Sequence, residues 1–342
     1  MSDFYSLDDA QQAACMRELA EAALPLWGIR PAAIALIKYR ENAVFAVSAD
    51  DGARYALRIH RHAYHSDAEL RSELQWIAAL AEAGVEVVHP LPTSTGELFA
   101  TVTVPAVPEP RQVDLFAWVN GQQLGSVETD IALDRQAVRH IYHTIGTLAA
   151  RLHNQACAWA PPPGFTRHAW DADGLAGDQP FWGRFWELGQ LSGEERELLV
   201  RARDRVYREL TAYAALPENS GRYSMIHADF VAENLMVEAG HVRLIDFDDA
   251  GFGWHLFEIA TALYFTMGED HYDEAYASLI AGYREQRDLP EHQVAQLPLF
   301  FLARSFTYLG WIHTRQETET AKTLGPMLIG KACALARDYL SR

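Results

Sequence analysis

The segment from residue 225 to 237 carries residues whose types and spacing could do chemistry. It reads MIHADFVAENLMV, so an apolar stretch leads into a His-x-Asp-x-x-x-x-Asn pattern containing Asp229 and Asn234, and a second apolar stretch follows. Eleven residues after Asn234 comes Ile245, with Asp246 directly behind it. Phosphoryl transfer requires a carboxylate that orients and deprotonates an attacking hydroxyl, together with oxygen ligands for Mg²⁺. Two neighbouring loops bearing these residues could supply both.

Such loops need firm anchors, because Mg²⁺ ligands at about 2.1 Å tolerate little drift. Short apolar runs at Tyr223–Ile226, Leu235–Val237 and Val242–Ile245 predict strands on either side of the two loops. The residues with chemical potential therefore lie between strands, where their positions can be held.

The rest of the chain predicts an α+β protein in which strands give way to helices. Its first part is expected to hold two helices and five strands, and its later part long helices and an all-helical end. Asp51-Gly52 is a hairpin signal between two of the strands. We expect a β-rich N-terminal lobe at 1–117, a hinge at 118–121 and a helical C-terminal lobe at 122–342. The expected elements are helices at 8–24, 66–83, 133–155, 193–215 and from 254 onward, and strands at 33–39, 44–49, 54–60, 98–104 and 113–119.

Composition and charge restrict the class of protein. The 342 residues are 49% hydrophobic and 22% charged, with a formal net charge of -17. That charge argues against nucleic acid as a partner. It is compatible with an amine-bearing small-molecule substrate, although solubility explains it as well. No run reaches the roughly 18 apolar residues of a membrane helix, and the start lacks a secretory signal. We therefore expect a cytoplasmic protein without membrane partners, and the oligomeric state stays open.

The three cysteines, Cys15, Cys157 and Cys333, stand far apart without Cys-x-x-Cys spacing. This excludes a zinc knuckle or a disulfide framework as an expectation. Each is predicted to be a small buried hydrophobic residue.

The motifs around Asp229 and Asp246 resemble those of the aminoglycoside phosphotransferase and choline kinase superfamily, which includes type II homoserine kinases and bacterial stress-response kinases. The resemblance is strongest from residue 226 to 262. It implies a protein-kinase-like fold of two lobes, with ATP and Mg²⁺ as cofactors. It further implies that Asp229 is the catalytic base, that Asn234 and Asp246 bind Mg²⁺, and that His227 braces the catalytic loop by hydrogen bonds.

Three nearby positions are less settled by this resemblance. Asp248 would lie near the acceptor or a second metal, or else be a solvated turn carboxylate. Glu258 stands where the family has an Asp that braces the catalytic loop, and its extra methylene leaves that role open. Ala228 replaces a glycine of many relatives, which is tolerable if its φ stays negative.

The resemblance also implies a nucleotide-binding cation at Arg58. Strand alternation places Ala56 and Arg58 on one face of the expected third strand. Family members carry Lys or Arg there, and of the 29 basic residues in this chain only three are lysine. The acidic partner would be Glu73 or Glu69 on the following helix, with Glu73 matching the family position better.

The remaining nucleotide contacts rest on the same resemblance. The sequence contains no glycine-rich phosphate loop, and Asn42 in the turn between the first two strands is the candidate phosphate contact. Trp118 and Val119 in the connector would meet adenine, although a plain linker has the same sequence pattern.

These observations favour an ATP-dependent phosphotransferase acting on a hydroxyl of a small molecule such as an amino alcohol, amino acid, sugar or aminoglycoside. A Ser/Thr protein kinase of the same fold and a metal-dependent phosphoester hydrolase are alternatives, and a non-catalytic nucleotide-binding module is a third. C-terminal aromatic residues and Arg304 could line the acceptor pocket or could pack in the core.

Overall fold

The protein folds as two compact units. The computed structural model describes residues 4–39, 42–124, 134–239 and 241–342. The first unit comprises Met1–Gly121 with Pro161–Thr166, and the second comprises Gln122–Ala160 with Arg167–Arg342. The connector segment 161–166 thus groups with the first unit.

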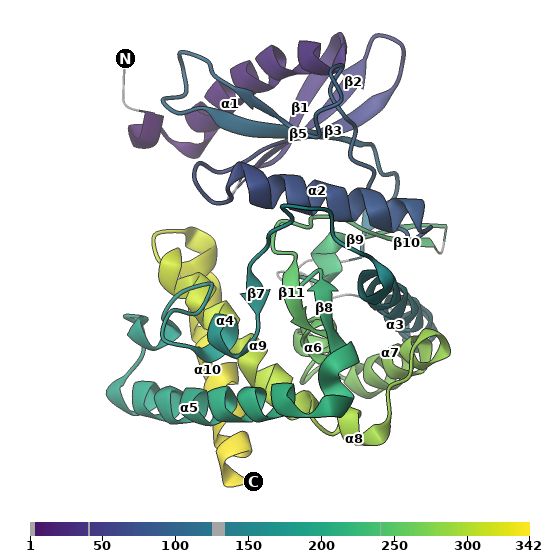
Figure 1. Cartoon of the computed structure of the whole chain (residues 1–342). Helices are drawn as coiled ribbons and strands as arrows, with labels where there is room; N and C mark the ends of the chain where they lie inside the picture. The colour runs from purple at the N-terminus through teal and green to yellow at the C-terminus, as the bar shows by residue number, and fades with distance from the viewer. Residues whose placement is uncertain (1–3, 40–41, 125–133, 240) are drawn as a thin grey trace. The chain divides into compact units, whose positions relative to one another are not determined.

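Within its described residues, the first unit contains one antiparallel sheet and two α-helices (Figure 1). The strand order is β1-β2-β3-β5-β4. Both helices begin at a capping box, made by Asp8 with Gln11 and by Ser66 with Glu69. The elements are α1 (Asp9–Ala23), β1 (Pro31–Tyr39), β2 (Ala43–Ala49), β3 (Arg54–Ile59), α2 (Asp67–Glu82), β4 (Ala100–Val102) and β5 (Arg111–Ala117).

Alternation along β3 separates a hydrophobic face from a charged one. Leu57 and Ile59 join Leu19 of α1 and Leu115 of β5 in one buried core cluster. Successive strand residues point to opposite faces, so Arg58 lies on the other face. Arg58 and Leu57 therefore lie on opposite faces of β3, as the strand alternation predicts.

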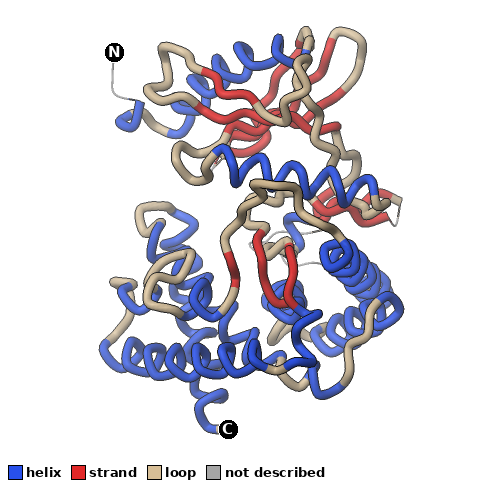
Figure 2. Tube along the Cα trace, in the orientation of Figure 1, coloured by secondary structure: helices blue, strands red, loops and turns tan. Residues whose placement is uncertain are grey.

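The second unit is mostly helical, with two three-stranded sheets (Figure 2). Their strand orders are β10-β9-β6 and β7-β11-β8. The elements are β6 (Gln122–Gln123), α3 (Arg135–Ala158), β7 (Ala169–Trp170), α4 (Ala172–Ala176), α5 (Gly193–Ala215), β8 (Tyr223–Ile226), β9 (Leu235–Glu238), β10 (His241–Leu244), β11 (Gly251–Trp254), α6 (His255–Tyr264), α7 (Tyr272–Gln286), α8 (Glu291–Val294), α9 (Leu297–Thr314) and α10 (Glu319–Ser341).

Helices α3 and α7 approach each other at a pair of glycines. A Cβ placed on Gly146 of α3 would lie 2.0 Å from the Leu279 carbonyl oxygen. A Cβ on Gly282 of α7 would lie 2.0 Å from the carbonyl oxygen of His143. The two backbones are therefore in direct contact, and neither position has room for a side chain.

Some elements differ from the sequence-based expectation. The glycine-rich β11 was not predicted, yet it pairs with β8 antiparallel and with β7 parallel. Strand β4 is shorter than the predicted 98–104. The prediction that all three cysteines are buried is wrong, because Cys157 is exposed and Cys15 is only partly buried. Among the described residues, no helix has the length and apolar character to cross a membrane.

Candidate functional site

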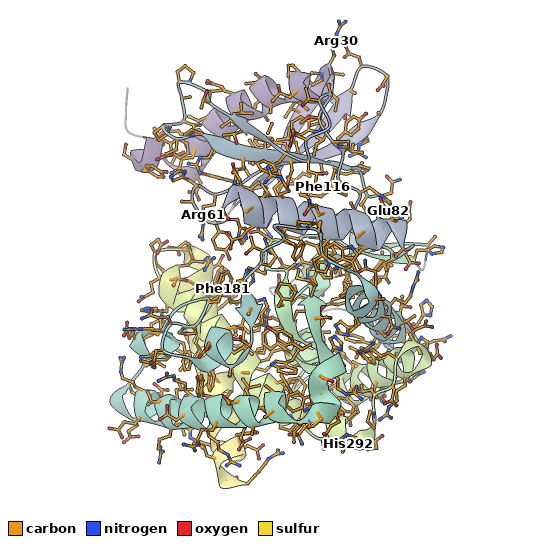
Figure 3. The ribbon with its side chains drawn as sticks, in the orientation of Figure 1. Arg30, Arg61, Glu82, Phe116, Phe181 and His292 are labelled. Atoms are coloured by element: carbon orange, nitrogen blue, oxygen red, sulfur yellow. The ribbon has the colours of Figure 1, made fainter. Side chains whose placement is uncertain are left out.

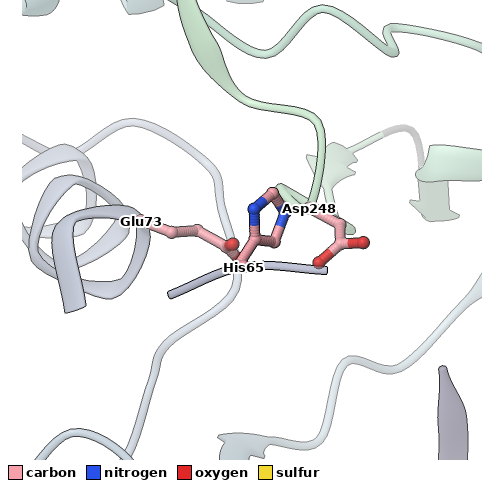
Figure 4. A group of neighbouring side chains, drawn as sticks. All are labelled: His65, Glu73 and Asp248. Atoms are coloured by element: carbon pink, nitrogen blue, oxygen red, sulfur yellow. The ribbon is translucent and has the colours of Figure 1, made fainter. Parts of the chain in front are cut away.

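In the first unit, Arg58 is held between two carboxylates. Its Nη2 donates to Glu73 Oε1 at 2.7 Å, and its Nε and Nη2 donate to Asp114 Oδ1 and Oδ2 at 3.1 and 2.6 Å. His60 Nε2 lies 3.0 Å from Asp114 Oδ2. Glu73 projects from α2 (Figure 4). The ring of Phe116, labelled in Figure 3, lies 5.2 Å from the guanidinium carbon. Arg58 is thus fixed by charge-assisted hydrogen bonds on two sides.

The sequence-based reasoning missed Asp114, the directly opposed residue of Arg58 on β5. Its carboxylate is fully buried; burial alone would raise its pKa, but the charges of Arg58 and His60 lower that pKa to about 2. A single carboxylate within the apolar run VDLF was the available signal. Glu69, the alternative partner for Arg58, instead completes the capping box of α2 with Ser66.

The other predicted nucleotide contacts of the first unit lie directly before β2 and directly after β5. Asn42 Oδ1 accepts from the backbone N–H of Arg61 at 3.0 Å, which ties the β1–β2 turn to the end of β3. The N–H of Trp118 donates to the Arg54 carbonyl at 3.2 Å, and its ring lies 3.9 Å from the Arg54 guanidinium carbon. Val119 follows directly and is partly buried. Contact of these residues with a nucleotide stays a prediction.

In the second unit, Asp229 and Asn234 lie on one loop between β8 and β9. Asn234 Nδ2 donates to the carboxylate Oδ2 of Asp229 at 2.8 Å and to its carbonyl at 2.9 Å. The other carboxylate oxygen, Oδ1, accepts from Arg304 Nη2 at 2.9 Å. The spacing of five residues therefore brings the two side chains into contact, with the carboxylate bound at both oxygens.

The neighbouring loop that carries Asp246 is joined to this one by hydrogen bonds. The N–H of Ile245 donates to the Asn234 carbonyl at 2.9 Å. His227 Nδ1 accepts from the N–H of Asp229 at 3.2 Å, so its Nε2 carries the proton and donates to the Ile245 carbonyl at 2.9 Å. Asp246 itself has a φ of 62°, a left-handed conformation uncommon for a non-glycine residue. His227 thus links the two loops.

Glu258 of α6 holds the start of the loop that carries Asp229 and Asn234. Its two carboxylate oxygens accept from the backbone N–H groups of His227 and Ala228 at 2.8 and 2.7 Å. Its Oε1 also lies 3.7 Å from Nε2 of His153, a distance that is too long for a hydrogen bond. Burial alone would raise the pKa of Glu258, but interactions with His153 and His227 lower it below its usual value. The extra methylene of Glu258 therefore does not prevent contact with the loop.

The condition on which Ala228 was expected to be tolerable, a negative φ, is not met. Its φ is 63°, not negative. A left-handed backbone conformation at a residue that carries a Cβ lowers stability by roughly 1–2 kcal/mol. The contacts of its N–H with Glu258 and of its carbonyl with Arg304 at 2.9 Å hold the peptide in this conformation.

A segment that the sequence did not mark, 167–170, binds the loop after Asp246. Arg167 donates to the carbonyls of Asp248 and Ala250. His168 Nε2 and Trp170 Nε1 lie 3.0 and 2.9 Å from the Asp249 carbonyl. The His168 ring also stacks on Phe181, labelled in Figure 3, with ring centroids 3.8 Å apart. Asp248 is therefore held through its backbone, and its role toward acceptor or metal stays a prediction.

The ligand chemistry of these loops fits Mg²⁺. Because Asn234 turns its Nδ2 toward Asp229, its Oδ1 is the amide atom left to bind a cation. Together with the carboxylate of Asp246, this offers hard oxygen donors and no sulfur, the ligand type that Mg²⁺ prefers.

Comparison with known proteins identifies the family. The model of the phosphotransferase enzyme family matches residues 34–294. The chain belongs to this family, and it is a kinase. The predicted protein-kinase-like α+β fold and the predicted family are confirmed.

Two relatives and two solved structures illustrate the range of similarity. A microcompartment-associated aminopropanol kinase is 34% identical, with a TM-score of 0.79 over 97% of each chain. An amicoumacin kinase of Bacillus subtilis is 23% identical over 88% of this chain and 86% of that one. An uncharacterized protein of Deinococcus radiodurans is 28% identical over 87% and 82%. The fold is also similar to an amicoumacin kinase solved with AMP-PNP and Ca²⁺, with a TM-score of 0.72 and 17% identity over 96% and 94%.

Proposed function

We propose that this kinase transfers the γ-phosphoryl group of ATP to a hydroxyl of a small molecule, with Asp229 accepting the hydroxyl proton. The observation that carries the proposal is the pair of hydrogen-bonded loops in the second unit. They bring together Asp229, bound at both carboxylate oxygens, and the amide of Asn234. They also tie Asn234 to the residue before Asp246.

The proposed reaction balances as follows. The acceptor oxygen forms a bond to the γ-phosphorus, the bond from that phosphorus to the bridging oxygen breaks, and ADP leaves. The acceptor proton passes to Asp229 and then to water. Asn234 Oδ1 and the Asp246 carboxylate would hold Mg²⁺, which when bound neutralises charge on the phosphate oxygens.

The nucleotide would also use residues of the first unit. In this proposal the Arg58 guanidinium binds phosphate oxygens while Glu73 and Asp114 fix its position. Asn42 would contact the phosphates, and Trp118 and Val119 would contact the adenine. The two carboxylates that bind Arg58 offset its positive charge locally, so its fixed geometry supports the assignment more than its charge does.

An amino alcohol is the acceptor class to test first. The aminopropanol kinase is 34% identical over 97% of both chains, and the net charge of -17 suits an ammonium-bearing substrate. Asp248 is the candidate residue for contact with that acceptor or with a second metal ion. The family membership favours phosphoryl transfer over phosphoester hydrolysis.

The test is an ADP-release assay of the purified chain with Mg·ATP against amino alcohols beginning with aminopropanol, then amino acids, sugars and aminoglycosides. Asp229→Asn should lower kcat by about 10³-fold and leave ATP affinity nearly unchanged, because the base acts on the acceptor. Asp246→Asn should instead weaken Mg·ATP binding. Asp288→Asn, at an 84% exposed side chain, is the matched control. Near-normal turnover by Asp229→Asn would refute the assignment.

A further inference from the structure

Helix α9 is apolar and almost fully buried, but an arginine stands at its centre. Around Arg304 the helix reads LPLFFLARSFTYLGW, and the Arg304 residue is 0% exposed. Burying a guanidinium costs several kcal/mol unless its surroundings compensate for the lost water. The partners of Arg304 therefore indicate why a charge is kept there.

Those partners belong mainly to the catalytic loop. Arg304 Nη1 donates to the Ala228 carbonyl and Nη2 donates to Asp229 Oδ1, both at 2.9 Å. Nη2 also donates to Tyr308 Oη at 2.9 Å. The remaining surroundings are ring faces of Tyr308, Trp182 and Phe257, whose centroids lie 4.2, 5.2 and 5.5 Å from the guanidinium carbon. The rings exclude water and favour the cation by cation–π contact.

The loop is held at three points near Asp229, two of them by Arg304 and the third by Asn234. The Arg304 guanidinium holds the carbonyl of the left-handed Ala228 and one oxygen of the next carboxylate. Asn234 holds the other oxygen of Asp229. The carboxylate of Asp229 is thus kept in a single orientation by one hydrogen-bond donor at each of its two oxygens.

We propose that Arg304 is a positioning residue for Asp229, and that it keeps this carboxylate directed toward the acceptor hydroxyl. The inference rests on the proposed function, in which Asp229 accepts the acceptor proton. Burial alone would lower the pKa of Arg304, but the oxygens of Tyr308 and Asp229 raise it above its usual value. The charge on Arg304 is therefore permanent.

A merely structural role for Arg304 predicts a loss of stability without a loss of turnover in the protein that stays folded. Removing one partner of a buried ion pair leaves the other uncompensated and is destabilising. Arg304→Met should therefore lower Tm by several degrees, and its kcat is compared with that of the parent below the onset of its unfolding. It should nevertheless lower kcat by about 100-fold, because a freed carboxylate loses its alignment. The KM for ATP should stay within about twofold.

A double-mutant cycle separates action through Asp229 from independent effects. In an Asp229→Asn background, adding Arg304→Met should lower kcat by less than about threefold, since the residue on which it acts has already been changed. Arg304→Lys should recover part of the loss, because one ammonium can reach Asp229 but does not provide the planar fork. Ser305→Ala, a buried change on the same helix that removes a hydroxyl donating to the Leu302 carbonyl, should leave kcat unchanged.

The outcomes distinguish the two proposals. If Asp229→Asn is inactive while Arg304→Met keeps kcat within about threefold of the parent, the role assigned to Arg304 is wrong and the proposed function stands. If the fold-losses in kcat of the two single variants multiply in the double variant, the role assigned to Arg304 is also wrong. If Asp229→Asn itself remains active, the proposed function fails first.

Discussion

Glu258 offers the sharpest test of how the catalytic loop is held. Its carboxylate is 0% exposed and accepts from two backbone N–H groups, those of His227 and Ala228, at 2.8 and 2.7 Å. In Glu258→Gln, the new amide presents an N–H₂ group to one of these donors. One N–H then loses its acceptor, and the other keeps only an uncharged one.

The expected loss follows from these two bonds. A buried donor left without a partner costs about 1–3 kcal/mol, and the change from a charged to a neutral acceptor removes about 1 kcal/mol more. The variant should therefore unfold with a free energy about 3 kcal/mol lower than the parent, which corresponds to a fall in Tm of roughly 4 °C for a chain of 342 residues. Loosening the peptide between His227 and Asp229 should also lower kcat by about 10–100-fold.

Urea unfolding at pH 7.5 and steady-state kinetics measure the two effects. Glu285→Gln on α7, whose side chain is 57% exposed, controls for the loss of a surface charge and should change the unfolding free energy by less than about 0.5 kcal/mol. Glu258→Asp keeps the charge but shortens the side chain and should fall between parent and Gln variant. A loss below about 1 kcal/mol in Glu258→Gln with an unchanged m-value would refute the bracing role.

Two further predictions concern Asp114 and Ala228. The folded pKa of Asp114 is about 2, below its ordinary value of 3.8, so its stabilisation is present above pH 4 and is lost as pH falls through 2. Asp114→Asn should remove about 2.5 kcal/mol of this pH-dependent stability, measured by unfolding at pH 2 to 7. Because Ala228 has a φ of 63°, Ala228→Val should lower the unfolding free energy by at least about 2 kcal/mol, whereas Ala228→Gly should stay within about 1 kcal/mol. Equal losses for both Ala228 variants would contradict the backbone explanation.

Local patterns predicted the parts of the fold that local physics determines. Helix α2 begins after Ser66, as the capping residue and the apolar spacing predict. Strands β2 and β3 meet at Gly52, whose φ of 87° the hairpin turn requires. Strand β11 escaped prediction because two of its four residues, Gly251 and Gly253, have low strand propensity, and pairing on both edges supplies what propensity does not.

Long-range partners were the parts of the site that sequence could not supply. Asp114 is separated from Arg58 by 56 residues and Arg304 from Asp229 by 75, so no spacing rule connects them. In both cases the available signal was a charge inside an apolar segment, which predicts a partner without naming it. The clamp at 167–170 acts on backbone carbonyls, and these leave no trace in side-chain patterns.

The glycine contact between α3 and α7 has a consequence for exchanging parts among related enzymes. Tyr283 follows Gly282 on α7, and its Oη lies 2.8 Å from Nδ1 of His153 on α3. The other ring nitrogen of His153 lies 3.7 Å from Glu258 Oε1. A chimera that takes one helix from a homologue with a bulkier residue at position 146 or 282 would spread the pair and carry His153 away from its neighbours. We therefore expect a chimera to keep its turnover when both helices are taken from the same parent.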